Sequence, residues 1–388
     1  MEVFVLGQTV GLYLHIPFCR SKCAYCDFYS LPTTDESAWD EYLAALTQHI
    51  RETAPSMAKH VLDTVYFGGG TPSLLGPKRL GALLDLLGKL YPLSSSPEIT
   101  LEGNPDSLDP KTLKKLKKQG FNRLSIGVQS FDDDMLRLLG RPHTAAQAEE
   151  AFQAARAAGF GNLSVDLLYG LPGQTRADWG RTLEKALSLK PEHLSCYGLK
   201  LEEGTPLHLM RHEYAFPDDD LQADMYLDTA EALKAAGFVH YEISNFCRPG
   251  YECRHNMKYW TVQPYVGLGP AAHSDCGGRR WSYVKDLKTY IDGIHQGDAL
   301  VAEMEDIPPL ERAGEYLMLR LRTAHGISGN EYTRDFRVSF DAIERRLELQ
   351  ESRGLAARSD GRWRLTEKGF LVSNQVIGDL LEQAETNV

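Results

Sequence analysis

The stretch GLYLHIPFCRSKCAYC, residues 11–26, decides the fold, because an apolar strand runs directly into three closely spaced cysteines. Cys19, Cys23 and Cys26 form a C-x3-C-x2-C pattern in a loop with enough slack to bend around a metal group. Three thiolates are one ligand short of a closed zinc site and of a cube held by four cysteines. His15 could supply a fourth zinc ligand, but it lies inside the strand, which is a poor position for closing the site. The pattern therefore leaves one metal position open for a small ligand.

The composition is that of a globular protein of two or three domains: 388 residues, 43% hydrophobic and 24% charged. Seven cysteines, an odd number, argue against a secreted disulfide framework and favour a metal site in a reducing compartment. The apolar N-terminal stretch lacks the basic residues with which a signal peptide begins. No apolar run reaches the ~18 residues that a membrane-spanning helix needs. We therefore predict a cytoplasmic protein, with peripheral attachment to a membrane left open. The net charge of −11 argues against a nucleic-acid partner.

Short apolar runs alternate with helix-compatible segments in the first half of the chain. The expected strands are 11–16, 62–70, 98–105, 123–130, 163–172 and 193–200, and the expected helices are 37–52, 77–90, 110–118, 144–158 and 175–189. Strands of this kind, buried on both faces and separated by helices, are typical of a parallel sheet. We predict an α/β fold, a partial (β/α)6 barrel, with a doubly wound open sheet as the alternative.

The pattern changes after about residue 215, so three regions are predicted. Residues 1–215 form the barrel, and residues 216–300 form an aromatic-rich connecting region. Residues 301–388 read as a winged-helix-like α+β module, with helices at 309–323 and 339–354 separated by a Gly-containing turn, then a tight turn at Asp360-Gly361. The module holds 12 Arg and Lys against 16 Asp and Glu, which favours a structural or partner-docking role over DNA binding.

The cysteine loop after the first strand of a βα barrel, with Tyr25 just before the last cysteine, resembles the radical S-adenosylmethionine (SAM) superfamily. The resemblance implies a [4Fe–4S] cluster on Cys19, Cys23 and Cys26, with the amino and carboxylate groups of SAM bound to the open iron. Reduction of such a cluster cleaves a carbon–sulfur bond of SAM. The glycine-rich stretch 68–72 resembles the superfamily's glycine motif, where backbone without side chains lets the methionyl group approach closely.

Four stretches, YLHIPFCRSKCAYCDFYS, FGGGTPSLL, SIGVQSF and VDLLYGLPGQT, together resemble oxygen-independent coproporphyrinogen III oxidases and the related HemW-type haem chaperones. The resemblance covers nearly the whole chain. By that resemblance, besides the three cysteines, the residues that contact the cluster or SAM are Tyr13, Tyr25, Gly69, Gly70, Thr71, Glu102, Gln129, Arg141 and Asp166.

Three features favour the chaperones over the oxidases. Phe28 stands where the oxidases have a further cysteine, and the chain starts almost at its first strand, whereas the oxidases carry an N-terminal extension. HNMKYW, residues 255–260, matches the H-N-x-x-Y-W pattern in which the histidine is implicated in haem binding. The resemblance therefore implies that His255 binds haem, with Asn256 fixing its tautomer and with Cys253 as the alternative iron ligand. Cys196, Cys247 and Cys276 read as ordinary buried thiols.

The chaperone interpretation implies haem and haem-accepting proteins as partners, an electron donor for the cluster, and dimerisation that depends on the cluster. The oxidase interpretation, oxidative decarboxylation in porphyrin biosynthesis, is the main alternative. Cleavage of SAM is left open, no catalytic residue is named, and turnover of coproporphyrinogen III is not expected. Radical modification of tRNA is a third alternative, which the acidic charge and the lack of an RNA-binding appendage disfavour.

Overall fold

A twelve-stranded sheet organises the computed structural model, which describes residues 9–385. Six parallel strands lie side by side in chain order. They are β1 (Thr9–Ile16), β4 (Val61–Gly69), β5 (Leu93–Gly103), β6 (Arg123–Gln129), β7 (Leu163–Tyr169) and β8 (His193–Gly198). These are the six strands predicted from the sequence. Their near-continuous apolar runs are buried on both faces, as a parallel sheet requires.

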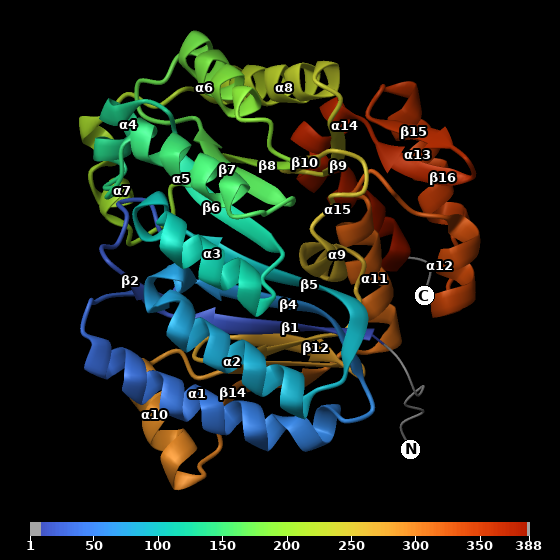
Figure 1. Cartoon of the computed structure of the whole chain (residues 1–388). Helices are drawn as coiled ribbons and strands as arrows, with labels where there is room; N and C mark the ends of the chain where they lie inside the picture. Colours follow the sequence, from blue (N-terminus) through green and yellow to red (C-terminus); the bar gives the residue numbers. More distant parts are fainter. Residues whose placement is uncertain (1–8, 386–388) are drawn as a thin grey trace.

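The helices between these strands cover the outer face of the curved sheet (Figure 1). They are α1 (Glu36–Met57), α2 (Gly76–Leu90), α3 (Pro110–Gln119), α5 (Ala145–Ala157) and α6 (Arg176–Ser188), with the short α4 (Asp133–Leu138) before α5. A doubly wound sheet reverses its strand order at a switch point, and no reversal occurs among these six strands. The sheet also stays open, since its edge strands are not paired with each other. The partial-barrel prediction is confirmed.

Polar residues begin several of these helices where the sequence predicts. The side chain of Asp109 accepts hydrogen bonds from the first turn of α3. Thr144 and Thr175 each form a capping box, with Gln147 and Asp178 respectively, at the start of α5 and α6. Because these caps satisfy backbone N–H groups that have no partner inside the helix, they fix where each strand-to-helix connection ends.

The chain after residue 205 adds strands to both edges of the barrel sheet. The short α7 (Pro206–Leu209) and α8 (Asp219–Ala235) precede β9 (Val239–Glu242) and β10 (Asn245–Cys247), which extend the β8 edge in antiparallel fashion. After α9 (Arg254–Trp260), β11 (Tyr265–Leu268) pairs with β1 in parallel. The antiparallel strands β12 (His273–Cys276), β13 (Arg279–Tyr283) and β14 (Val301–Asp306), with α10 (Leu287–Gln296) between the last two, complete the other edge. The region 216–300 thus belongs to the same sheet, and the proposed domain boundaries stay a prediction.

The C-terminal residues form a small module with its own apolar core. Its elements are α11 (Pro309–Arg320), α12 (Gly329–Phe336), α13 (Asp341–Ser352), β15 (Ala356–Ser359), β16 (Arg362–Leu365), α14 (Glu367–Leu371) and α15 (Ser373–Glu385). Asp360 and Gly361 join β15 to β16 with positive φ angles of 53° and 72°, as the predicted tight turn requires. Helices α12, α14 and α15 were not predicted from the sequence. Within residues 9–385, no helix is both long enough and apolar enough to cross a membrane.

Candidate cluster and cofactor site

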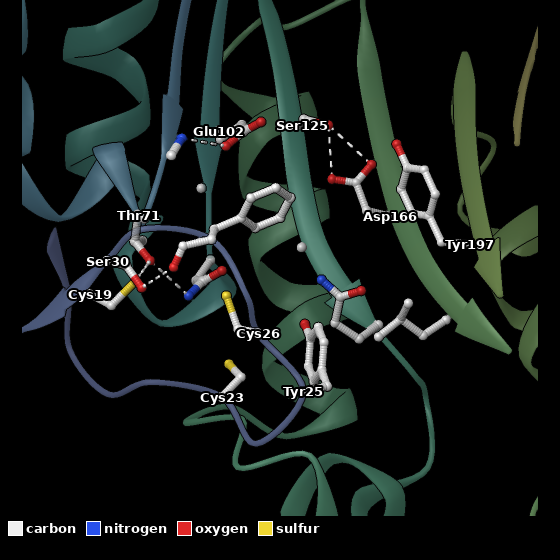
Figure 2. Close-up of a pocket in the computed structure, with 18 of the residues that line it drawn as sticks. Cys19, Cys23, Tyr25, Cys26, Ser30, Thr71, Glu102, Ser125, Asp166 and Tyr197 are labelled. Carbon is white, nitrogen blue, oxygen red and sulfur yellow. Dashed lines mark hydrogen bonds between the residues drawn. The ribbon is translucent and has the colours of Figure 1, made fainter. Parts of the chain in front are cut away.

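A cavity of about 490 Å³ opens at the C-terminal ends of the parallel strands. Cys19, Cys23 and Cys26 lie along one part of its wall, and Figure 2 shows their sulfur atoms close together and facing the interior. The carboxylates of Glu102 and Asp166 lie deeper, on the other side of the cavity (Figure 2). The site therefore has a thiol end and a carboxylate end, and it lies where βα barrels place their chemistry.

Backbone hydrogen bonds hold the cysteine loop in place. Ala24 donates its N–H to the carbonyl of Leu139 at 3.0 Å, and its own carbonyl accepts from Leu207 at 2.8 Å. The Cys26 N–H donates to the carbonyl of Cys23 at 3.2 Å, which closes a tight turn between the last two cysteines. The loop is thus tied to the segment after α4 and to the start of α7, two parts of the chain far from it in sequence.

Two polar side chains donate hydrogen bonds to the thiol sulfurs. Thr71 Oγ1 lies 3.5 Å from Cys19 Sγ, and Arg141 Nη1 lies 3.3 Å from Cys23 Sγ. Burial raises the pKa of the Cys19 and Cys26 thiols, and hydrogen bonding from Thr71 partly opposes the shift at Cys19. A bound metal is needed to hold such buried thiols as thiolates, and the donors from Thr71 and Arg141 would then stabilise the negative sulfurs.

The donor set of this loop fits an iron–sulfur cluster. All three cysteines are free of disulfides and face one cavity that has room for further atoms. In the part of the chain that the structure describes, no three His, Cys, Asp or Glu side chains converge on the position of a single metal ion. A cube of four irons does not need such convergence, because each thiolate binds its own iron.

The glycine motif after β4 brings bare backbone to the cavity wall. Gly69 has a φ of 113°, and a Cβ atom there would come within 2.7 Å of the His15 ring. At Gly70, a Cβ atom would lie 2.6 Å from the Phe18 carbonyl oxygen. Because neither glycine position has room for a side chain, bare backbone lines the cavity at Gly69 and Gly70, and Thr71 follows with its hydroxyl near Cys19.

Glu102, at the end of β5, is a half-buried carboxyl group that lines the cavity. Its Oε1 accepts a hydrogen bond from the Tyr66 hydroxyl at 2.7 Å, and its Oε2 accepts one from the Gly69 N–H at 3.3 Å. Burial raises the pKa of Glu102 to about 7, and nearby Asp166 also raises it, whereas the hydrogen bond from Tyr66 lowers it. A carboxyl group with this pKa accepts or releases a proton near neutral pH.

Arg141 joins the cysteine end of the cavity to the ends of β5 and β6. Besides its contact with Cys23, its Nη2 donates to Asn104 Oδ1 at 2.7 Å and to the Gly127 carbonyl at 2.5 Å. Gln129, the last residue of β6, has a φ of 68°, which is uncommon for a residue with a side chain. Gln129 and Arg141 both line the cavity, and their contact with SAM stays a prediction.

Asp166 on β7 accepts hydrogen bonds from two serines on neighbouring positions of the sheet. Ser125 Oγ lies 2.9 Å and 3.1 Å from its two carboxylate oxygens, and Ser164 Oγ lies 3.1 Å from one of them. Burial raises the pKa of Asp166, and these hydroxyl donors oppose the rise. Tyr25 is half-buried at the wall, where desolvation raises the pKa of its hydroxyl and the Arg141 charge lowers it.

Tyr13 and His255 are the two predicted site residues that do not line this cavity. Tyr13 points instead to a second, neighbouring groove, and its hydroxyl lies 3.0 Å from His15 Nδ1. The two residues lie against each other on the sheet, with ring centroids 6.4 Å apart. They are therefore separate from the other eleven predicted residues.

His255 is held inside the protein at the first turn of α9. Its Nδ1 lies 2.8 Å from Thr64 Oγ1, and its Nε2 lies 2.8 Å from the Tyr259 hydroxyl. Its ring stacks on Tyr66, and burial lowers its pKa to about 3, so it is neutral at pH 7. In this arrangement both ring nitrogens already have partners, and an iron at either nitrogen would displace one.

The surroundings of His255 differ from the sequence prediction in two further ways. Thr64 and Tyr259, and not Asn256, contact the His255 ring nitrogens, and Asn256 lines the cluster cavity instead. Cys253 is fully buried, its sulfur contacts Glu98 Oε1 at 3.8 Å, and burial raises its pKa to about 12. A thiol in that environment is a poor thiolate ligand. Cys196 and Cys247 are buried as predicted, whereas Cys276 is half-buried.

Several residues that line the cavity were not predicted from the sequence. Asn104 connects Arg141 to Thr71, to whose hydroxyl it donates at 3.2 Å. Its position directly after the third predicted strand was a signal that could have identified it. The remaining polar side chains that line the deep part of the cavity are Tyr66, Arg123, Ser125, Ser195 and Tyr197. They alternate along strands with core residues, so the sequence does not separate them from structural polar groups.

The chain matches two family models, the Radical SAM superfamily over residues 13–186 and the HemN C-terminal domain over residues 307–372. It is 37% identical to the haem chaperone HemW of Bacillus subtilis over 95% of this chain and 98% of that protein. The chain belongs to the HemW family of radical SAM proteins. Its identity to the Escherichia coli haem chaperone HemW is 32%, over 95% of this chain and 97% of that one.

The HemW-family chain also shares its fold with a solved structure, the coproporphyrinogen III oxidase HemN from Escherichia coli, described as a radical SAM enzyme. The two chains superpose with a TM-score of 0.85 over 99% of this chain and 92% of HemN, at 24% sequence identity. At that identity the likeness establishes the fold, including the barrel and the C-terminal module. Membership in the radical SAM superfamily implies a [4Fe–4S] cluster and SAM.

Proposed function

We propose that this protein is a haem chaperone, which binds haem and delivers it to haem-dependent proteins. The observation that carries the proposal is the similarity over nearly the full length to proteins named haem chaperone HemW in several bacteria. The cavity supports it, because a cysteine loop with three free thiols and a glycine motif are both in place. Porphyrin chemistry by the related oxidase is the alternative that these relatives disfavour.

The residues of the cavity divide into two roles in this proposal. Cys19, Cys23 and Cys26 hold the cluster, and Thr71 and Arg141 donate hydrogen bonds to its sulfur ligands. The backbone of the glycine motif would hold the methionyl group of SAM, whose amino and carboxylate groups would bind the iron that the three cysteines leave open. When bound, this pair supplies one-electron reduction and carbon–sulfur bond cleavage, and the protein supplies a shielded, oriented cavity.

The carboxylate end of the cavity suits the rest of the SAM molecule. Glu102 and Asp166 offer acceptors for ribose hydroxyls, and Gln129 offers an amide that donates and accepts. We assign no catalytic residue, because each of these groups has a binding or positioning role that its contacts explain.

Phe28 supports the chaperone over the oxidase. It occupies the position of the oxidases' further cysteine, and its side chain is 71% exposed, at the edge of the cluster cavity. A phenyl ring there can neither bind iron nor transfer a proton. We therefore expect no multi-turnover decarboxylation of coproporphyrinogen III.

The proposal extends to partners and place. A haem chaperone needs an acceptor protein, and a cluster that is reduced needs an electron donor. We propose both partners. We also propose a cytoplasmic location with peripheral membrane association, which cell fractionation can test, and cluster-dependent dimerisation, which sedimentation can test.

A single sample tests the function. The cluster is reconstituted anaerobically in the full chain, and haem and then coproporphyrinogen III are offered to it. We expect stoichiometric haem with a distinct Soret band, transfer of that haem to an apo-haem protein, and no protoporphyrinogen IX. Repeated conversion of coproporphyrinogen III would assign the protein to the oxidases instead, and failure to bind haem would remove the proposal.

A further inference from the structure

A second groove, of about 510 Å³, lies next to the cluster cavity. Half-buried tyrosines from three segments line it: Tyr13 from β1, Tyr259 from α9 and Tyr265 from β11. The rings of Tyr259 and Tyr265 contact each other edge to face, with centroids 4.6 Å apart. A groove with so many aromatic walls fits a flat, largely apolar ligand.

One side chain belongs to both the groove and the cluster cavity. Phe28, two residues after the last cluster cysteine, lines each of them and is the most exposed large apolar side chain among the described residues. An aromatic ring left 71% exposed next to an apolar groove is poised to cover a flat ligand there. Its place in the cysteine loop means that a ligand in the groove lies beside the cluster.

The groove contains a histidine with an accessible ring. His273, the first residue of β12, is exposed, and its ring makes no hydrogen bond or ion pair with any residue in the described part of the chain. The other histidine of the groove, His15, is unsuitable, because its Nδ1 contacts the Tyr13 hydroxyl and its Nε2 contacts the Tyr29 carbonyl at 2.9 Å. Ala271, just before His273, has a φ of 57° and also lines the groove. An alanine held in that left-handed region marks a turn whose shape the surrounding fold imposes.

The groove also carries a positive charge at its rim. Lys285 is exposed, and its ammonium group lies 6.0 Å from the centre of the Tyr29 ring. An apolar planar ring system with carboxylate substituents and a metal that accepts an imidazole matches three features of the groove: aromatic walls, the cation of Lys285, and an uncommitted histidine. Asp27 is the acidic side chain of the lining, so the carboxylate substituents would lie at the Lys285 side of the groove.

We propose that haem binds in this groove with His273 as its iron ligand, with Phe28 against the porphyrin face and Lys285 near a propionate. The inference rests on the proposed chaperone function and names the site where it acts. His255 is then a positioning residue, because its hydrogen bond holds Tyr259, which forms a wall of the groove. Haem would lie beside the cluster and not inside the cluster cavity.

Anaerobic haem titration of the full, cluster-loaded chain tests the site. We compare the wild type with His273→Ala, His255→Ala and His295→Ala, the last removing an exposed histidine of α10 outside the groove. We expect His273→Ala to shift the Soret band and weaken haem binding about tenfold or more, whereas His295→Ala changes neither. His255→Ala should keep the Soret position of a histidine-bound haem, even if the affinity falls.

Rescue separates ligation from structural damage. In His273→Gly, added imidazole should restore the wild-type Soret position, because the free base can occupy the ligand position that the side chain left. A normal spectrum in His273→Ala, combined with loss of the haem band in His255→Ala, would overturn the site and leave the chaperone function intact. Absence of haem binding by the wild type would instead overturn the function on which the site rests.

The proposed contact between Phe28 and the porphyrin can be tested separately, by haem affinity. Phe28→Ala should weaken haem binding about tenfold, because the porphyrin loses a ring contact, while the iron–sulfur absorption stays unchanged, because a phenyl ring binds no iron. Phe28→Tyr, which keeps the ring, should bind haem as the wild type does. Equal haem affinity in the alanine variant and the wild type would contradict the proposed position of the porphyrin.

Discussion

At the scale of single residues, the cysteine thiols of the cluster cavity can hold either a proton or a metal. Cys19 and Cys26 have raised thiol pKa values because they are buried, so without metal they stay protonated. Thr71 and Arg141 supply hydrogen bonds to sulfur from outside the loop. The loop therefore binds a metal group at the cost of releasing thiol protons, which makes loading with iron dependent on pH.

Removing any one of the three cysteines should abolish the cluster. We expect Cys19→Ala, Cys23→Ala and Cys26→Ala, each reconstituted anaerobically, to lack the visible iron–sulfur absorption, since two thiolates do not hold a cube. Cys276→Ala is the matched control and should reconstitute normally, because Cys276 lies on β12 outside the cavity. A full cluster spectrum in any of the three loop variants would contradict the assignment of its ligands.

Glu102 should make SAM binding depend on pH. Its pKa is raised to about 7, so its carboxyl group is mostly neutral below that pH and a charged acceptor above it. Hydroxyl groups of the ligand donate more strongly to the charged form, so affinity should rise about tenfold from about pH 6 to about pH 8. Calorimetric titration of the reconstituted protein measures this.

The control for that titration is another buried carboxyl group. Glu242 on β9 also has its pKa raised by burial to about 7, but it does not line the cavity. We expect Glu102→Gln to bind SAM more weakly and without the pH dependence, and Glu242→Gln to behave as the wild type. The same pH profile in both variants would show that the dependence has another source.

At the scale of elements, the short helix α9 joins the two cavities. Its Asn256 faces the cluster cavity and its Tyr259 faces the groove, with His255 buried between them. The helix has only seven residues and no side-chain cap of its own. Instead Glu98 of β5 accepts from the backbone N–H groups of Arg254 and His255 at 3.1 Å and 3.0 Å.

Glu98→Ala should therefore loosen α9. Loss of a carboxylate cap leaves two N–H groups unpaired at a buried helix start, which should lower the free energy of unfolding by about 1–2 kcal/mol. We expect faster hydrogen exchange in residues 254–260, read by mass spectrometry, and weaker haem binding. Glu348→Ala, at an exposed position on α13, should change neither. Unchanged exchange in the Glu98 variant would show that packing alone holds the helix.

The elements also show how far the sequence could lead. The six parallel strands were predictable because each is a nearly continuous apolar run, which only a sheet buried on both faces needs. The edge strands were not: β14 reads VAEMED and is exposed along its length, so it has no apolar pattern. Helix α12 was missed because Gly326 lies just before it and Gly329 is its first residue, and two glycines so close together are typical of a turn.

The candidate site divides in the same way. The cysteine loop, the glycine motif and the polar residues at strand ends were predictable, because chain order places strand ends at one edge of a parallel sheet. His255 and Tyr13 were assigned through motifs, which specify residue types and their spacing but not where each side chain points. Only the fold shows that His255 faces Thr64 and Tyr259, and that His273, in no motif, lies open in the groove.

At the scale of the whole molecule, ion pairs attach the C-terminal module to the barrel sheet close to the groove. Asp275 on β12 pairs with Arg312 of α11 at 2.6 Å and with Arg280 of β13 at 3.3 Å. Arg280 in turn pairs with Glu315 of α11 at 2.8 Å. Asp275 and Arg312 are each only 15% exposed, so this network is partly shielded from water. Docking of the module thus fixes β12, the strand that carries His273.

Asp275→Ala should weaken both the docking of the module and the groove. Arg280 and Arg312 would lose one of the two carboxylates that they share, while Glu315 still pairs with both, so the free energy of unfolding should fall by roughly 1–2 kcal/mol. Asp306→Ala is the matched control on the same sheet edge, because its ion pair with Arg279 is exposed and should contribute at most about 0.5 kcal/mol. Because β12 carries His273, Asp275→Ala should also weaken haem binding while leaving the iron–sulfur absorption unchanged. Thermal unfolding and haem titration of the two variants measure the difference, and equal behaviour of both would mean that the module and the groove are independent.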